Sequence, residues 1–86
     1  MLHIIRHGHS FVEILTDTGS YLVDPYITGN PKCTISVAQI CEKNILGIFL
    51  THGHGDHIGD TLHIYEKIQC PIVCEYGLGK YFEQVY

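Results

Sequence analysis

A continuous apolar run occupies residues 45–50 of this 86-residue chain and is interrupted only by Gly47. A strand of this composition is typical of a sheet that is covered on both faces. The run follows a segment with helical apolar spacing and directly precedes a polar, glycine-rich loop. It therefore predicts a strand that is buried on both faces, within a layered arrangement of strands and helices.

The segments around this run predict the rest of the fold. Short apolar segments separated by turn residues predict an opening β-meander. Apolar residues at helical spacing predict helices, of which two would begin at the N-cap residues Ser36 and Asp60. The predicted elements are strands at 2–5, 11–15 and 21–23, a helix at 36–43, the strand at 45–50, a helix at 60–68, a strand at 71–75 and a helix from 77 to 86. This order predicts an α+β fold, with a β-meander followed by α-β-α-β-α.

The charge balance and composition exclude several classes of protein. The sequence has five Lys and Arg residues against nine Asp and Glu, a formal net charge of −4. Without a Lys/Arg cluster, no nucleic-acid partner is expected. No apolar run approaches the roughly 20 residues that span a membrane, so no membrane span is expected. The first residues do not resemble a signal peptide and the cysteines form no CxxC pair, so we expect a cytoplasmic protein with reduced thiols.

The segment 51–60, directly after the apolar run, concentrates three His and two Asp in ten residues. Ligands bind at the carboxyl ends of strands in α/β sheets. The alternation of His52 and His54 places both imidazoles on one side of an extended loop, and Asp56 and His57 could approach a second ion. Such nitrogen and oxygen donors suit zinc, and also manganese or iron. A loop of hydrogen-bonded histidines is the alternative, but it does not need three His at this spacing.

The pattern His52-x-His54-x-Asp56-His57 resembles the metal-binding signature of the metallo-β-lactamase superfamily. Asp24, at the end of a predicted strand, matches the position of an acidic residue that supports the metal site in that superfamily. Three segments are similar, more specifically, to a family of uncharacterised metal-dependent hydrolases related to the ascorbate-phosphate lactonase and phospholipase D-like branches. These segments are residues 9–11, 23–31 and 50–57. The resemblance covers essentially the whole chain.

The resemblance implies a four-layer αββα sandwich built from two similar halves, with the metals at the edge between two sheets. Residues 1–86 would then form a single partial domain, the N-terminal half of that fold. By this analogy His52 and His54 bind one metal ion, and Asp56 and His57 bind a second. The cofactor would be one or two zinc ions, with manganese or iron as alternatives. The remaining ligands of the superfamily come from later in the fold than this sequence reaches.

The resemblance also implies an activity, the hydrolysis of an ester, lactone or phosphodiester in a small-molecule substrate by hydroxide that the metal makes available. Asp56 would orient the nucleophile and transfer a proton to the leaving group. A second chain or a homo-oligomer could complete the fold and its ligand set. The alternative is a non-catalytic metal-binding fragment, or a module that oligomerises through its open sheet edge and last helix.

Further residues near the first predicted turn have two interpretations each. His9 could support the metal site or contact the substrate, and a structural role is equally compatible with its position. Arg6 is a solvated charge in the simpler interpretation, and contact with an anionic substrate is the alternative. Residues 31–33 lie in a loop that could line the opening of the site. His63, on a predicted helix, is expected at the surface.

Overall fold

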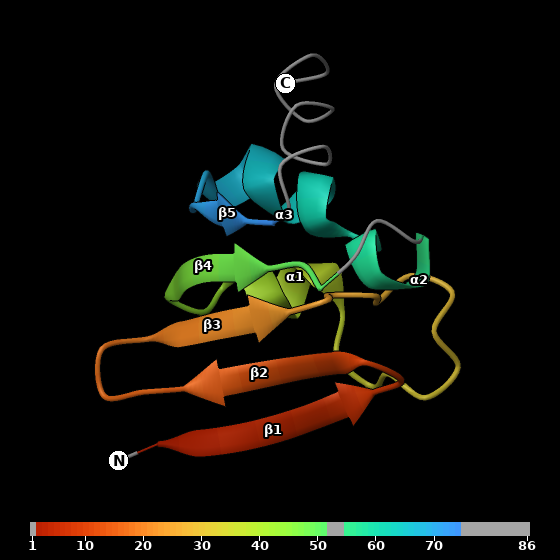
Figure 1. Cartoon of the computed structure of the whole chain (residues 1–86), viewed down its shortest axis with the longest axis horizontal. Helices are drawn as coiled ribbons and strands as arrows, with labels where there is room; N and C mark the ends of the chain where they lie inside the picture. The colour runs from red at the N-terminus through yellow and green to blue at the C-terminus, as the bar shows by residue number, and fades with distance from the viewer. Residues whose placement is uncertain (1, 52–54, 75–86) are drawn as a thin grey trace.

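A computed structural model of the chain describes residues 2–51 and 55–74. Within these residues, five strands form one sheet in the order β1-β2-β3-β4-β5, with helices between them along the chain (Figure 1). The elements are β1 (His3–Gly8), β2 (Phe11–Leu15), β3 (Ser20–Val23), α1 (Val37–Cys41), β4 (Ile45–Phe49), α2 (Gly55–Ile58), α3 (Thr61–Ile68) and β5 (Ile72–Val73). The expected α+β architecture and its opening β-meander are confirmed. The last predicted helix, from Gly77, lies outside the described residues.

The strand pairing changes from antiparallel to parallel across the sheet. β1, β2 and β3 pair in antiparallel fashion, whereas β3 pairs with β4 and β4 with β5 in parallel. Parallel pairing needs a crossover connection, and the segments that contain α1 and α3 supply the two crossovers. As a result β3 and β4 end at the same edge of the sheet, and the residues that follow them, Asp24 and the segment from Leu50, lie side by side.

β1 is longer than the apolar segment 2–5 predicts. It continues through His7 to Gly8, with a register shift between the Arg6–Val12 and Gly8–Phe11 pairs. Gly8 has a φ angle of 125°, a conformation that favours glycine, so the irregularity lies where the sequence can adopt it. The turn to β2 is therefore short.

Helix α1 begins where its sequence predicts. The Ser36 side chain accepts a hydrogen bond from the Gln39 backbone N–H at 3.1 Å, and the Gln39 side chain accepts one from the Ser36 N–H at 2.9 Å. These two bonds form a capping box, which satisfies two backbone donors at the helix start. Ile40 is fully buried and attaches the helix to the core.

Helix α3 follows Asp60 as predicted, but its buried side differs from the expected one. The spacing predicts that Leu62, Tyr65 and Ile68 face the core, whereas the buried residues are Thr61 and Ile64. Leu62 and Ile68 are partly buried against the core, and Tyr65 is half-buried. The sequence alone does not fix how the helix is rotated, and here its contact with α1 and the sheet sets the buried side.

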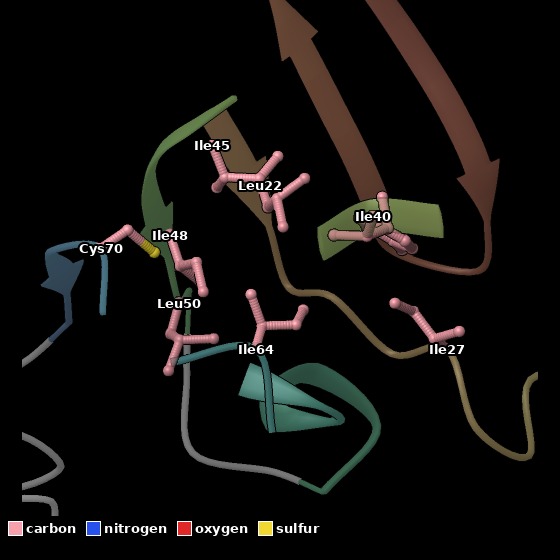
Figure 2. Close-up of a cluster of buried hydrophobic side chains, with 9 residues drawn as sticks. Leu22, Ile27, Ile40, Ile45, Ile48, Leu50, Ile64 and Cys70 are labelled. Atoms are coloured by element: carbon pink, nitrogen blue, oxygen red, sulfur yellow. The ribbon is translucent and has the colours of Figure 1, made fainter. Parts of the chain in front are cut away.

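The hydrophobic core lies where side chains from the strands meet those of α1 and α3 (Figure 2). Its buried members are Phe11, Leu22, Ile27, Ile40, Ile45, Ile48, Leu50, Ile64 and Cys70. Ser20 pairs with Ile45 while Tyr21 pairs with Gly47, so β4 carries one extra residue at this point. This bulge places Ile45 and Ile48 on the same, core-facing side of the sheet.

The other side of the sheet, called here the open sheet face, remains partly exposed. The strand register places on it Ile4, Val12, Ile14, Tyr21, Val23, Phe49 and Val73. Ile4 is 69%, Phe49 38% and Val73 53% exposed. The prediction that the strand at 45–50 is buried on both faces is therefore wrong for Phe49, because no described element covers this side.

A buried carboxylate lies on the core-facing side of the meander. Glu13 is fully buried and accepts hydrogen bonds from Ser20 Oγ at 2.5 Å, Lys43 Nζ at 2.9 Å and His7 Nε2 at 2.8 Å. Burial alone would raise the pKa of Glu13, but the bonds from Ser20, His7 and Lys43 outweigh it and lower the pKa. Sequence reasoning did not single out this residue.

The helices of the described segments are all short. None of them combines the length and the apolar character that crossing a membrane requires.

Candidate metal-supporting site

Asp24 directly follows β3 and is almost completely buried, with 2% of its surface exposed. Its backbone N–H donates to the Phe49 carbonyl at 3.0 Å, which holds it against the end of β4. Asp24 has a positive φ of 50°, an uncommon conformation for a residue other than glycine. Such strained residues persist where the surrounding structure fixes them, and they are frequent at functional sites.

The Asp24 carboxylate accepts three hydrogen bonds from two residues. The Thr51 N–H donates to Oδ1 at 2.8 Å, the Thr51 hydroxyl donates to Oδ2 at 2.6 Å, and His57 Nδ1 lies 2.8 Å from Oδ2. Burial opposes ionisation of this carboxyl, but the hydrogen bonds from Thr51 and His57 outweigh it and lower the pKa of Asp24. Asp24 is therefore a buried anion at neutral pH.

His57 lies in α2 and turns its side chain inward, with 12% of that side chain exposed. Because an ionised carboxylate can only accept, the proton between the two groups belongs to His57 Nδ1. In the neutral imidazole the lone pair then lies on Nε2, the tautomer that binds a metal ion through that atom. Asp24 thus fixes both the orientation and the tautomer of His57.

His9 reaches the same edge of the sheet from the β1–β2 turn. It has a positive φ of 58°, and its ring centroid lies 5.6 Å from that of Tyr26 and 6.3 Å from that of His57. The structure therefore brings together three of the residues that the sequence singles out, namely Asp24, His57 and His9.

Asp60, which precedes α3, binds the loop that follows Asp24. Its carboxylate accepts from the Ile27 N–H at 2.9 Å, the Thr28 N–H at 2.7 Å and the Thr28 hydroxyl at 2.8 Å. Its own N–H donates to the Pro25 carbonyl at 3.0 Å. Burial would raise the pKa of Asp60, but the bonds from Thr28 and Ile27 lower it. The expected N-cap bond is absent among the described contacts of Asp60, because its oxygens are engaged by the 27–28 backbone instead.

Gly59 permits the close approach of these two segments. A Cβ at this position would lie 2.5 Å from Tyr26 Cα and 2.6 Å from the Pro25 carbonyl oxygen. Gly59 also has a positive φ of 48°. A side chain at this position would push the segment between α2 and α3 away from residues 25 and 26.

The other predicted ligands are not all described. His52 and His54 lie outside the described residues, and Asp56 belongs to α2 but its side chain is not described. Within residues 2–51 and 55–74, no three His, Cys, Asp or Glu side chains are arranged so that they could hold a metal ion. The metal ligands therefore remain predictions, whereas the contact of Asp24 with His57 is a feature of the structure.

Thr51 was missed as a functional residue, although its position gives a signal. It is the first polar residue after the apolar run, and its backbone and hydroxyl groups both bind Asp24. His63 lies at the surface as expected, with 71% of its side chain exposed.

Comparisons with known proteins show which family the chain is similar to. Residues 6–86 match the metallo-beta-lactamase superfamily. A UPF0173 metal-dependent hydrolase of Bacillus cereus is 40% identical over 80 residues, which are 93% of this chain. Another from Geobacillus thermodenitrificans is 41% identical over 80 residues, again 93% of this chain. This chain spans 34% of the length of both relatives.

A solved structure shows the same fold. Igni18, described as a novel metallo hydrolase from the hyperthermophilic archaeon Ignicoccus hospitalis KIN4/I, matches 96% of this chain with a TM-score of 0.88 and 25% sequence identity. The match covers 36% of the Igni18 chain. The sequence therefore corresponds to about a third of the length of these proteins, whereas the resemblance implied the N-terminal half of the fold.

Proposed function

Since this chain belongs to the metallo-β-lactamase superfamily, we propose that it carries the first metal ligands of a zinc-dependent hydrolase that cleaves an ester, lactone or phosphodiester in a small molecule. The observation that carries the proposal is the 2.8 Å contact between His57 Nδ1 and the buried Asp24 carboxylate. A carboxylate bound to the second nitrogen of a histidine is the usual support of a metal-binding imidazole. Two relatives described as metal-dependent hydrolases also support it.

The donor chemistry of the chain fits a borderline metal such as zinc. His52 and His54 would hold one ion, and Asp56 and His57 a second, with His57 binding through Nε2. Imidazole nitrogens and a carboxylate oxygen are ligands that zinc accepts, as do manganese and iron. When bound, the metal would act as a Lewis acid and lower the pKa of water toward neutrality.

Other residues of the chain would support the proposed ligands or transfer protons. Asp24 keeps the His57 proton on Nδ1, and Thr51 holds Asp24 through two hydrogen bonds. Asp60 fixes the Asp24 loop to the start of α3. Asp56 would accept a proton from the attacking nucleophile and pass it to the leaving group.

A whole site would need more ligands than the four residues proposed here. A catalytic zinc site has three protein ligands and one open position, whereas each proposed pair here gives two. The chain spans about a third of the length of its relatives, 34% for both relatives described above. We propose that the missing ligands come from that remaining length, from a second chain or from a second copy.

A second candidate function is a metal-binding module that assembles with another protein without catalysing a reaction. The open sheet face favours it, because Ile4, Phe49 and Val73 expose apolar side chains on one side of the sheet. Exposed apolar patches commonly mark contact surfaces. This module would bind metal but would turn over no substrate.

The test measures zinc binding and hydrolysis in parallel. Zinc affinity is determined by competition with a fluorescent chelator for the wild type, His57→Ala and the control His63→Ala, whose histidine is exposed on α3. We expect affinity to fall at least tenfold in His57→Ala and to stay unchanged in His63→Ala. Equal affinity in all three proteins would overturn the metal assignment.

Hydrolysis of generic lactone and phosphodiester substrates is then followed with and without zinc or manganese. Metal-dependent turnover that His57→Ala abolishes supports the hydrolase. Metal binding without turnover, together with a defined oligomer in native mass spectrometry, would favour the non-catalytic module.

A further inference from the structure

A basic cleft lies beside the candidate site. Two neighbouring cavities of about 220 and 350 Å³ open at the β1–β2 turn and share three of their lining residues, Arg6, His9 and Lys32. His7 and Gly8 line the first cavity, and Ser10 lines the second. We use the name basic cleft for the two cavities together.

The positive charge of the cleft is not balanced by the described residues. Arg6 and Lys32 are exposed, and within residues 2–51 and 55–74 neither forms an ion pair with a carboxylate. The carboxylate that contacts a lining residue of the cleft is that of Glu13, which already binds His7 and Lys43. Two permanent cations therefore remain on one concave surface of a chain whose formal net charge is −4.

Hydrogen bonds hold together the backbone segments that carry the two cations. Asn30 is buried, and its amide donates to the Gly8 carbonyl at 3.1 Å while its side-chain oxygen accepts from the Lys32 N–H at 3.0 Å. A Cβ at Gly8 would lie 2.7 Å from the Lys32 carbonyl carbon, so the two backbones are in direct contact. Asn30 and Gly8 thus fix the Lys32 loop against the strand that carries Arg6.

His9 connects the cleft with the candidate metal-supporting site. His9 lines both cavities, and its ring centroid lies 6.3 Å from that of His57. A group bound between Arg6 and Lys32 would therefore lie on the His9 side of His57. Guanidinium and ammonium groups bind oxyanions, and the Ser10 hydroxyl adds a further donor at the wall.

We infer that the basic cleft binds an anionic substituent of the substrate, a phosphate or a carboxylate group that does not itself react. This inference rests on the proposed hydrolase, since it assigns the substrate class of that same site. Of the two interpretations of Arg6, the inference adopts contact with the substrate. The substituent would orient the substrate so that the bond to be cleaved lies toward His57.

The first test measures anion binding alone. The chain is titrated with inorganic phosphate and, separately, with acetate, and the dissociation constants are determined by NMR for the wild type, Arg6→Gln and Lys32→Gln. Lys67→Gln is the matched control, because it removes the same charge from an exposed position on α3. Loss of one charge-assisted contact is expected to weaken binding roughly tenfold in each cleft variant and to leave the control unchanged.

The two anions also distinguish the substituents. Tighter binding of phosphate identifies a phosphorylated substrate, and tighter binding of acetate identifies a carboxylate. Failure of both anions to bind, or equal binding in all variants with spectra that show an intact fold, would overturn the inference.

The second test separates the inference from the proposed function. The zinc-loaded protein is assayed with two ester substrates that differ only in a remote charged group, and the ratio of the two kcat/KM values is compared. We expect the preference for the anionic ester to fall about tenfold in Arg6→Gln and Lys32→Gln and to persist in Lys67→Gln. Hydrolysis without any preference would overturn the inference and leave the hydrolase standing. Anion binding without hydrolysis of either ester would leave the cleft standing and would favour the non-catalytic module over the hydrolase.

Discussion

His57 Nδ1 lies 2.8 Å from Asp24 Oδ2, although the two residues are 33 positions apart in the chain. The contact exists because β3 and β4 are parallel and end at the same edge of the sheet. Asp24 follows the first of these strands, and the loop with His57 follows the second. The topology of the sheet thus joins a buried anion to the imidazole that we propose as a metal ligand.

The charge of Asp24 is expected to control zinc affinity. Asp24→Asn keeps the size of the side chain, and Asn tolerates the positive φ of this position, so the variant changes mainly the charge. We expect zinc affinity to fall by roughly 10- to 100-fold, as it does when the partner of a metal-bound histidine is removed. Chelator competition measures it, with the exposed Glu66→Gln as control. An unchanged affinity for Asp24→Asn would separate this contact from metal binding.

The buried Glu13 is expected to make the fold sensitive to acid. Its pKa is lowered below the ordinary value of 4.5 by the bonds that it accepts, despite its burial. A lowered pKa in the folded state contributes stability that is present above the unfolded pKa and is lost as the pH falls through the folded pKa. Glu13→Gln should cost about 2–3 kcal/mol at pH 7.

Urea unfolding of the wild type and Glu13→Gln between pH 7 and pH 3 measures this contribution. We expect the difference between the two free energies of unfolding to shrink as the pH falls below 4.5, the ordinary value for this carboxyl. The lowered pKa values of Asp24 and Asp60 act in the same direction in both proteins. A difference that stays constant over the whole range would contradict the assignment.

Gly59 is expected to be the less replaceable of two glycines with positive φ. A Cβ at Gly59 would lie 2.5 Å from Tyr26 Cα, whereas one at Gly29 would have 3.7 Å to its nearest neighbour. Gly59→Ala should therefore cost about 2–4 kcal/mol from steric overlap and backbone strain, and Gly29→Ala about 1 kcal/mol from strain alone. Chemical denaturation compares the two, and equal losses would show that the close approach is not a constraint.

Asp60 is expected to act on stability through the loop after Asp24. Asp60→Ala removes the acceptor of two backbone N–H groups and should cost about 2–4 kcal/mol. Thr28→Ala removes one donor and should cost about 1 kcal/mol. Thermal unfolding measures both, with the exposed Thr34→Ala as control. If Asp60→Ala were as stable as the control, the hydrogen bonds to residues 27 and 28 would not hold the loop.

Local signals in the sequence predicted the local features of the fold. The capping box at Ser36 needs only residues three positions apart, and β2 follows the apolar segment 11–15. The rotation of α3 and the exposure of Phe49 could not be predicted in this way. Both depend on which helices pack against each face of the sheet, and the periodicity of apolar residues does not contain that information.

The same distinction between local signals and tertiary contacts applies to the candidate site. The resemblance of the motif indicated Asp24 and His57, but their contact depends on the parallel pairing of β3 with β4. Glu13 was not recognised because its partners lie between 6 and 30 positions away in the chain. Asp60 was interpreted as a helix cap because the sequence does not show that a distant backbone competes for its carboxylate.

The order of the strands also has a consequence for folding. Each strand pairs with the one that precedes it along the chain. The connections from β1 to β2 and from β2 to β3 are short, whereas the parallel pairings of β4 and β5 close the longer crossovers that contain α1 and α3. Asp24 can meet Thr51 and His57 only after β4 has joined the meander. A chain that adds its strands in this order would form the contact between Asp24 and His57 late, and a defect in β4 would remove the edge on which that contact depends.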